Sequence, residues 1–340
     1  MADTMLAAVF EGEGKLALKE VAVPGIEKAD EVLLEVEAAS ICGTDCQILK
    51  VPAGHPATPG AVLGHEYVAK VLEPGSGVSH LKPGDRVAID PNLTCGLCRY
   101  CRIGLPNMCE NMTTLGIFIN GGFAKYNVAP ARALHPISAD LPTDVAIFAE
   151  PMSCVVNGSN KLALRPGESV LVLGAGPIGL YYTALMKANG ASKIIVAEVT
   201  EMRAAKAKEM GADIVINPIK ESLPDLIKQE TQVGVDAAID AVGSLMADAL
   251  LNTRRGGRIL LFGMNSNAHY DLQQYDITRY EKTVIGTFIA NHTFPATIQL
   301  LESGQLPLEK LITHRMGLEA IAEGMDIMRS GDAIEIIVTP

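Results

Sequence analysis

The chain has 340 residues, which is enough for two domains at roughly 150 residues each. Hydrophobic residues make up 48% and charged residues 20%, a balance that is typical of globular proteins and argues against disorder. The net charge is −11 and the sequence has no cluster of Lys and Arg, so we expect neither nucleic acid nor an anionic membrane surface as a partner. No apolar run approaches the roughly 20 residues of a membrane-spanning helix.

The N-terminal sequence and the cysteines indicate the compartment. Residues 1–6 lack the basic stretch and the apolar stretch of a secretory signal, so we expect a cytoplasmic protein, in which disulfides are rare. The sequence contains seven cysteines, and four of them lie within fifteen residues. An odd number with such clustering predicts metal binding rather than disulfides.

Residues 1–155 are rich in short predicted strands separated by Gly and Pro. The runs 32–36 and 67–72 are candidate strands, and residues 81–87 predict a turn that enters another strand. Many short strands with such turns are typical of a barrel or a sandwich.

Two fragments of this part, residues 41–45 and 64–66, carry side chains that bind metals. Cys42 offers a thiolate and His65 an imidazole, and a third ligand is needed. Glu66 or Glu150 could supply it, the latter from a strand or turn that leads into the second half of the chain. Three protein ligands and a water define a catalytic zinc site. The alternative is a buried cysteine, a core histidine and two solvated carboxylates.

A second cluster consists of Cys95, Cys98, Cys101 and Cys109. Four sulfurs complete the tetrahedral coordination of Zn²⁺ and leave no open position, so this spacing predicts a structural zinc site. An iron–sulfur cluster would accept the same four thiolates, and four unconnected thiols are the remaining interpretation.

The pattern changes near residues 165–167, after which predicted strands and helices alternate. This alternation predicts a parallel sheet with right-handed crossovers. The predicted strands are 169–173, 193–197, 214–216, 235–240 and 258–262, and the predicted helices are 177–188, 200–210, 221–230 and 245–252. A further helix is expected at 296–302 and a last strand at 335–338.

A glycine-rich turn, residues 174–179, lies between the first of these strands and the first helix. Its glycines allow a tight turn, a close approach of backbone to a pyrophosphate, and close packing of helix on strand. Glu198 follows at the end of the second strand, where an acid binds a ribose 2′-hydroxyl and repels a 2′-phosphate. The acid favours NAD over NADP, while the nearby Arg203 leaves NADP open. The alternative is an ordinary strand–helix turn with a surface glutamate.

Taken together, these motifs resemble the zinc-dependent medium-chain dehydrogenases. The resemblance covers nearly the whole chain, through residues 42–45, 64–66, 95–109, 149–151, 174–179 and 312–315. The pair Glu150–Pro151 is similar to the branch of sorbitol and threonine dehydrogenases, because liver-type alcohol dehydrogenases have a cysteine ligand at this place.

This resemblance implies an α/β protein with two domains. Residues 1–155 and 295–340 would form a GroES-like β-barrel catalytic domain, and residues 156–294 an inserted, doubly wound Rossmann domain that binds NAD. Each chain would hold one catalytic zinc, on Cys42, His65 and either Glu66 or Glu150, and one structural zinc on the four cysteines. The residues that match cofactor-binding motifs of the family are Gly174, Gly176, Pro177, Ile178, Gly179, Glu198, Arg203, Val242, Gly263 and Thr287.

The resemblance also implies an activity. We expect oxidation of a secondary alcohol, a polyol or a related hydroxy compound, to a ketone, with zinc as Lewis acid and hydride transfer to NAD. Asp45 would orient His65, and Thr44 would accept the hydrogen bond of the substrate hydroxyl and pass its proton outward. The polar contacts expected for sorbitol are partly missing, since residues 288–290 read Phe-Ile-Ala where that branch has Phe-Arg-Tyr.

Other activities stay open at this point. Within the family the substrate could be L-threonine, a 2,3-diol or a sugar phosphate. Outside it, the chain could be a non-catalytic NAD-binding sensor or a zinc-free enone or quinone reductase. The expected partners are a small alcohol or ketone and further copies of this chain, as a homodimer or homotetramer.

Overall fold

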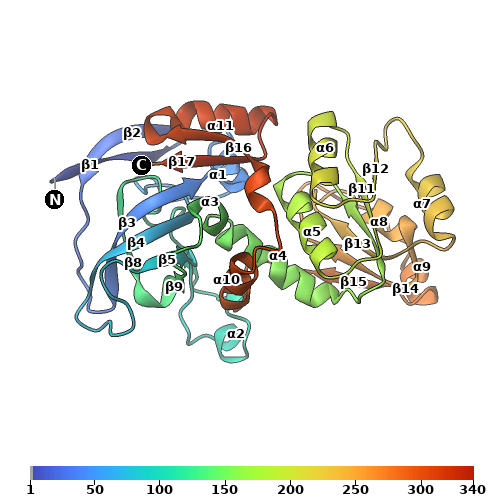
Figure 1. Ribbon diagram of the computed structural model, residues 1–340, viewed down its shortest axis with the longest axis horizontal. Helices are drawn as coiled ribbons and strands as arrows, with labels where there is room; N and C mark the ends of the chain where they lie inside the picture. The colour runs from blue at the N-terminus through green and yellow to red at the C-terminus, as the bar shows by residue number, and fades with distance from the viewer. Residues whose placement is uncertain (1–2) are drawn as a thin grey trace. The chain divides into compact units, whose positions relative to one another are not determined.

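The computed structural model describes residues 3–340 (Figure 1). Their contacts divide them into two units. The first unit contains the chain up to Pro151 together with Phe294–Ser303 and Glu309–Pro340, and the second contains Met152–Thr293 and Gly304–Leu308. Within residues 3–340, no helix combines the length and the apolar character that crossing a membrane requires.

Strands dominate the first unit, as predicted. Its largest sheet has the strand order β16-β17-β3-β4-β5-β9, with β8 also paired to β3, and β1-β2 and β6-β7 form two small sheets. The strands are β1 (Thr4–Gly12), β2 (Lys15–Ala22), β3 (Glu31–Ser40), β4 (Glu66–Pro74), β5 (Arg86–Ile89), β6 (Asn92–Leu93), β7 (Thr113–Thr114), β8 (Tyr126–Pro130), β9 (Leu134–Ile137), β16 (Ile312–Gly317) and β17 (Glu335–Thr339). The C-terminal β17 pairs with β3, so distant parts of the chain build one sheet (Figure 1).

Short helices connect these strands. They are α1 (Gly43–Ile48), α2 (Arg99–Arg102), α3 (Thr143–Ala146), α10 (Phe294–Glu302) and α11 (Ile321–Ser330), with 3-10 turns η1 (Pro106–Met108), η2 (Ala131–Ala133), η3 (Leu308–Leu311) and η4 (Leu318–Ala320). The apolar core of the unit is built from β1, β3 and β4, with α1 and α11 packed on it. Burial of this apolar surface holds the short strands together.

The second unit contains the parallel sheet predicted from the alternating pattern. Its strand order is β12-β11-β10-β13-β14-β15, and every neighbouring pair is parallel. The strands are β10 (Ser169–Leu173), β11 (Lys193–Ala197), β12 (Ile214–Ile216), β13 (Val235–Asp240), β14 (Thr253–Leu261) and β15 (Thr283–Gly286). The order reverses between β10 and β13, which is the point where doubly wound sheets bind nucleotides.

Helices α4 (Ala149–Leu162), α5 (Pro177–Ala188), α6 (Glu201–Glu209), α7 (Leu223–Thr231), α8 (Met246–Asn252) and α9 (Gln274–Arg279) complete the secondary structure. Helix α5 packs on β10 and β11, and α8 packs on β13 and β14. Leu171, Ile195 and Ala238 are fully buried in a core that the sheet forms with α7 and α8.

Three elements of the second unit, β14, β15 and α9, differ from the sequence-based expectation. Strand β14 begins at Thr253 rather than at Arg258, because its first half contains arginines and a Gly-Gly pair that hide the apolar pattern. Strand β15 and helix α9 are not predicted from the sequence. Strand β15 lies at the edge of the sheet beside β14 and is half exposed. An edge strand does not need the long apolar run of a central strand, so the sequence carries no clear signal for it.

Candidate active site

Cys42 lies at the junction of β3 and α1. Hydrogen bonds at the start of this helix hold the Cys42 residue in place. The Cys42 N–H donates to Asp45 Oδ2 at 2.9 Å, and the Thr44 N–H points at Cys42 Sγ at 3.5 Å. Together these bonds form a capping box, in which the cap residue and the third helical residue satisfy each other's backbone groups. The short sequence Cys-Gly-Thr-Asp therefore places a thiol, a hydroxyl and a buried carboxylate side by side.

His65 and Glu66 lie at the start of β4, directly after a backbone position that requires glycine. Gly64 has a φ of +91°, and a Cβ there would come within 2.7 Å of the Phe123 ring. The turn brings the buried His65 toward α1, where its Nδ1 lies 3.6 Å from Asp45 Oδ1. The Asp45 carboxylate therefore lies near the imidazole, at a distance longer than a hydrogen bond.

The donor atoms of Cys42, His65 and Glu66 all lie within 4.8 Å of one another. Thiolate, imidazole and carboxylate at such spacing are the ligand types of zinc. Glu150 is buried as well and its charge acts on both Cys42 and Glu66, but its carboxylate lies outside this group of three. The structure corrects the expected setting of Glu150, which lies in the first turn of helix α4 and not on a strand or turn. Pro151 is compatible with this position, because the first turn of a helix needs no N–H donors.

The electrostatics of this group favour a bound cation. Burial, followed by the charge of Asp45, raises the pKa of the Cys42 thiol to about 12. Burial alone would lower the pKa of His65, but the Asp45 carboxylate, followed by Glu66 and Glu150, raises it to about 9. A thiolate and several carboxylates at one buried place are stable only beside positive charge. The residues present therefore fit a zinc ion.

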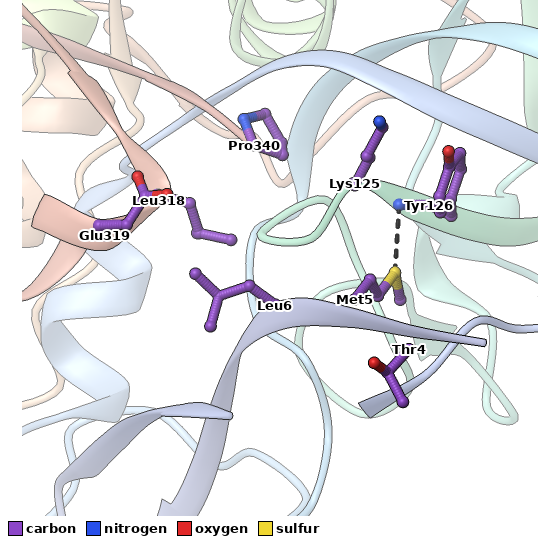
Figure 2. A pocket seen from close by; sticks show the side chains of 8 residues that line it. All are labelled: Thr4, Met5, Leu6, Lys125, Tyr126, Leu318, Glu319 and Pro340. Atoms are coloured by element: carbon purple, nitrogen blue, oxygen red, sulfur yellow. Dashed lines mark hydrogen bonds between the residues drawn. The ribbon is translucent and has the colours of Figure 1, made fainter. Parts of the chain in front are cut away.

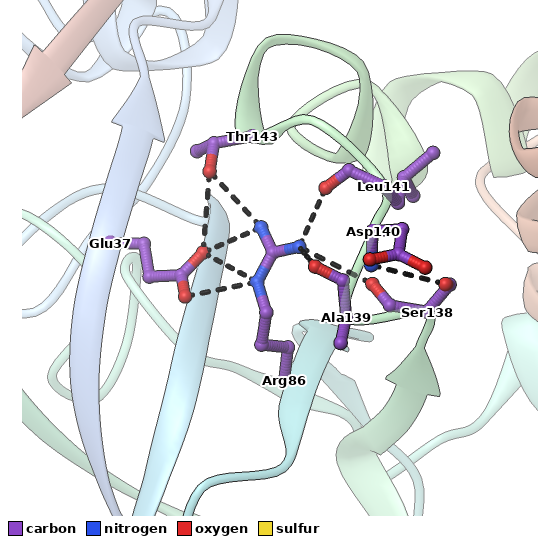
Figure 3. A network of polar contacts seen from close by, with 7 residues as sticks. All are labelled: Glu37, Arg86, Ser138, Ala139, Asp140, Leu141 and Thr143. Carbon is purple, nitrogen blue, oxygen red and sulfur yellow. Dashed lines mark hydrogen bonds and ion pairs between the residues drawn. The ribbon is translucent and has the colours of Figure 1, made fainter.

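A network around Arg86 anchors the chain segment that leads to α4 (Figure 3). The Arg86 guanidinium donates to Glu37 Oε2 at 2.8 Å, to the Leu141 carbonyl at 2.6 Å and to Thr143 Oγ1 at 3.0 Å. Bidentate and multiple bonds of this kind are the strong charge-assisted class. They attach the start of α3 to strands β3 and β5, and so fix the approach to Glu150 in the same unit.

The four cysteines of the second cluster come together within one loop. Neighbouring sulfurs lie 3.5 Å apart for Cys98 and Cys101 and 3.5 Å apart for Cys95 and Cys109. Backbone N–H groups point at these sulfurs, and they hold the pKa of the Cys95 thiol at about 6. Burial, followed by the neighbouring thiols, instead raises the pKa of Cys101 to about 12, so four thiolates at this place would need a cation between the sulfurs.

The glycine-rich turn connects β10 to α5 at the predicted place. A Cβ on Gly179 would come within 1.9 Å of the Gly174 carbonyl oxygen, so only glycine allows this approach of helix and strand. Beside Gly176 a Cβ would meet no atom within 4 Å, which leaves its backbone open to a ligand. Pro177 and Ile178 begin α5, whose free N–H groups favour a phosphate.

Glu198 lies beside this turn at the end of β11. Its side chain links the glycine turn to the loop that follows β11. Its carboxylate accepts from the N–H of Ala175 at 2.7 Å, Val199 at 2.9 Å and Thr200 at 2.8 Å. The acid is therefore both close to the glycine turn and fixed in direction. Arg203, the other residue named for the ribose end, lies half-buried on α6.

Asp240 and Asn157 organise the remaining loops, and the sequence reasoning missed both. Asp240 is buried at the end of β13. Its side-chain Oδ1 accepts hydrogen bonds from the N–H groups of Val242 and Gly243, at 2.9 and 2.8 Å. Its backbone carbonyl accepts a hydrogen bond from the Gly263 N–H at 3.0 Å. Asn157 on α4 donates to Thr287 Oγ1 at 3.4 Å. The only signal for Asp240 was its place at the end of a predicted strand, while Asn157 gave none.

Two surface hollows of the first unit lie elsewhere. One, of about 280 Å³, is lined by residues of β1, β2 and β8 and by loop residues. Figure 2 shows the other, of about 180 Å³, lined by Thr4, Met5, Leu6, Lys125, Tyr126, Leu318, Glu319 and Pro340. Neither lining includes a candidate metal ligand, so neither hollow is part of the candidate metal sites.

Two family models match the chain. Residues 28–139 match the alcohol dehydrogenase GroES-like domain, and residues 177–303 match the zinc-binding dehydrogenase domain. Over 99% of its length the chain is 33% identical to D-arabinitol dehydrogenase 1 of Uromyces fabae, of which it covers 97%. The chain belongs to the zinc-dependent medium-chain dehydrogenase family. The family and the fold class expected from the sequence, a GroES-like barrel with a Rossmann domain, are thereby confirmed.

Another curated relative and a solved structure are similar to this dehydrogenase over nearly the whole chain. The chain is 34% identical to an L-threonine 3-dehydrogenase of Xanthomonas campestris pv. campestris, with 95% of each chain covered. A zinc-binding dehydrogenase of Sinorhizobium meliloti 1021, crystallised with NADP, superposes with a TM-score of 0.94 at 28% identity, with 100% of both chains covered. The protein is therefore an oxidoreductase that acts on CH–OH groups and uses zinc and a nicotinamide cofactor.

Proposed function

We propose that this dehydrogenase oxidises a secondary hydroxyl of a polyol or related hydroxy compound to a ketone, reversibly and with NAD. The observation that carries the proposal is the group of the half-buried Cys42 and the buried His65 and Glu66, whose donor atoms lie within 4.8 Å of one another. Within the chain, the first unit would be the catalytic domain and the second unit the NAD-binding domain.

Cys42, His65 and Glu66 would hold the catalytic ion, and Glu150 would exchange with Glu66 as third ligand. Zinc bound there supplies a Lewis acid that lowers the pKa of an alcohol. Asp45, whose Oδ1 lies 3.6 Å from His65 Nδ1, would orient the imidazole. Four-sulfur coordination by the cysteine loop would add one structural zinc per chain.

Thr44 is the residue to handle the substrate proton. It is half-buried, directly follows the Cys42–Gly43 pair and lies at the start of α1, so its hydroxyl is close to the ligand group and near solvent. The hydroxyl would accept the substrate hydrogen bond and pass the proton outward. Gln47, on the exposed side of the same helix, cannot carry a proton further as an imidazole would.

The carboxylate of Glu198 supports NAD rather than NADP. It is buried beside the glycine turn and held by three backbone N–H groups, so it cannot swing away from a 2′-phosphate. A fixed negative charge at this place repels that phosphate and accepts a bond from a free ribose hydroxyl. Gly174, Gly176 and the start of α5 would bind the pyrophosphate.

L-Threonine is the second candidate substrate, because the threonine dehydrogenase of Xanthomonas campestris is as similar to this chain as the arabinitol dehydrogenase is. L-Threonine and arabinitol both carry a secondary alcohol that the same zinc chemistry could oxidise.

We further propose a homodimer or homotetramer. A cytoplasmic setting would keep the clustered thiols reduced.

The test is a substrate panel with the purified chain. Pentitols, hexitols, 2,3-butanediol, a sugar alcohol phosphate and L-threonine are offered with NAD and with NADP, and formation of reduced cofactor is followed by absorbance. We expect turnover with a polyol and NAD, and loss of activity on removal of zinc by a chelator. Full activity after zinc removal would contradict the metal assignment, and turnover of L-threonine alone would replace the polyol by the second candidate.

A further inference from the structure

The loop that follows β15, residues 287–293, contains two non-glycine residues in the left-handed region of backbone conformation. Ile289 has a φ of +38° and His292 a φ of +56°. For a β-branched side chain such as isoleucine this conformation is strained, and it persists only where surrounding contacts enforce it. Residues held in this way gather at ligand-binding and active sites, so the strain at Ile289 points to a use of this loop in binding.

Helix α4 supplies the contacts that enforce this conformation. Asn157 is 4% exposed, and its side-chain amide donates to the Ile289 carbonyl at 2.6 Å and to the Phe288 carbonyl at 3.3 Å. One turn earlier in the helix, the Ser153 carbonyl accepts a hydrogen bond from the Thr293 hydroxyl at 2.7 Å. Because Ser153 and Asn157 are four residues apart, they lie on one face of α4. This face therefore holds both the strained turn and the end of the loop.

The loop lies at the same edge of the sheet as the glycine-rich turn. Strands β10, β13, β14 and β15 are neighbours and run parallel, so the loops that follow them emerge at one edge. The Thr287 N–H donates to the Leu261 carbonyl at the end of β14, at 3.3 Å. The loop after β14 in turn touches the loop after β13, because a Cβ on Gly263 would come within 2.2 Å of the Gly243 nitrogen. Doubly wound sheets bind their ligands outside this carboxyl edge.

We propose that Asn157 is a positioning residue for cofactor binding, whose amide holds residues 287–289 in the strained conformation that the bound cofactor requires. Asn157 acts through this loop and makes no contact with the cofactor itself. Since the amide stabilises the conformation before the cofactor arrives, binding does not have to supply that free energy. The inference rests on the proposed function, in which the second unit binds NAD.

A positioning role and a purely structural role of Asn157 make different predictions. If Asn157 positions the loop, the harm of losing its amide arises from the positive φ at Ile289, and a residue that adopts this φ freely should repair it. Glycine is such a residue, whereas alanine is not. Ile289→Gly should therefore rescue Asn157→Ala, and Ile289→Ala should not. If Asn157 only packs α4 against the sheet, neither second substitution should help.

The experiment titrates the purified chain with NADH, follows the fluorescence of the bound cofactor, and measures thermal unfolding without cofactor as a check of folding. Asn157→Ala should raise the Kd for NADH about tenfold, as loss of one or two hydrogen bonds predicts. The double variant with Ile289→Gly should return to within about threefold of wild type, because glycine needs no amide to hold it. The double variant with Ile289→Ala should stay about tenfold weaker than wild type. Asn160→Ala, exposed on the same helix, is the matched control and should bind NADH as wild type does.

The outcomes are distinguishable. A wild-type Kd for Asn157→Ala overturns the proposal, and so does a rescue that Ile289→Gly fails to give or that Ile289→Ala gives equally. A wild-type chain that binds neither NADH nor NADPH contradicts the proposed function, and this proposal with it. If Asn157→Ala does not fold, Asn157→Ser keeps a polar group that is too short to bond both carbonyls, and unchanged NADH affinity there also overturns the role of Asn157.

Discussion

The four-cysteine loop and the group of Cys42, His65 and Glu66 offer metal ligands in opposite settings. The loop gathers its ligands from fifteen consecutive residues, and it exposes large apolar side chains such as Leu97 at 72% and Ile103 at 60%. The other group takes its ligands from the start of α1 and the start of β4, and it is surrounded by buried carboxylates.

The two settings suit two different uses of a metal ion, one structural and one catalytic. A loop with little apolar core of its own would gain order from a closed four-sulfur site, and the proposed ion there would take the place of a core. A buried site that the surrounding sheet has already built has less need of an ion for folding. An ion bound by Cys42, His65 and Glu66 would be available for chemistry, because three protein ligands leave one coordination position for a substrate.

The largest effect is expected from loss of a ligand in the buried group. His65→Ala should lower kcat/KM by about a thousandfold or more, because Lewis-acid stabilisation contributes several kcal/mol and each 1.36 kcal/mol is tenfold. Metal analysis should find one zinc per chain less, with the fold retained by circular dichroism. Cys46→Ala, in the same region but outside the ligand group, is the control and should keep its zinc. If His65→Ala kept near wild-type turnover, the catalytic use of this site, in contrast to the structural use of the cysteine loop, would be wrong.

Loss of a ligand in the exposed loop should act on stability first. Cys98→Ser should remove the other zinc and lower the free energy of unfolding by about 2 kcal/mol or more, since loss of a structural metal belongs to the strongly destabilising changes. Chemical denaturation with and without added zinc measures the effect. If Cys98→Ser abolished turnover without loss of stability, the structural role of the loop would be wrong.

A smaller effect is expected at Asp240, which holds the Val242 and Gly243 loop. Asp240→Asn replaces an acceptor oxygen by a donor, and loss of charge-assisted bonds of about 1.5–3 kcal/mol should raise KM for NAD about tenfold, with a smaller change in kcat. Steady-state kinetics with varied NAD measures the split. Asp248→Asn, exposed on α8, is the matched control. A change in kcat alone would argue that the loop does not serve cofactor binding.

The smallest effect is expected at Glu198. Glu198→Ala should weaken binding of both cofactors and shift the ratio of kcat/KM for NAD over NADP about fivefold toward NADP, since one repulsive charge of roughly 1 kcal/mol is removed. The exposed Glu201→Ala on α6 is the control. An unchanged ratio would leave the cofactor preference to other residues, Arg203 among them.

Much of this protein is determined by sequence patterns that are local. The order of strands and helices after residue 165 predicts the parallel sheet, because each buried strand and each amphipathic helix is a contiguous run. The glycine turn at residues 174–179 and the cysteine loop are contiguous as well. Their backbone conformation and their ligand spacing therefore follow from a few neighbouring residues.

Other features were decided only by tertiary structure. The first turn of α4 could not be told from a loop at Glu150–Pro151, because proline is compatible with both. The edge strand β15 lacked an apolar run, and Asn157 binds a loop 130 residues away in the sequence. Ser40 at the end of β3 has Glu66 on one side and Ile337 on the other only because β17 returns to β3. Burial and charge at such positions depend on which strands become neighbours, and contacts between distant residues leave no periodicity in the sequence.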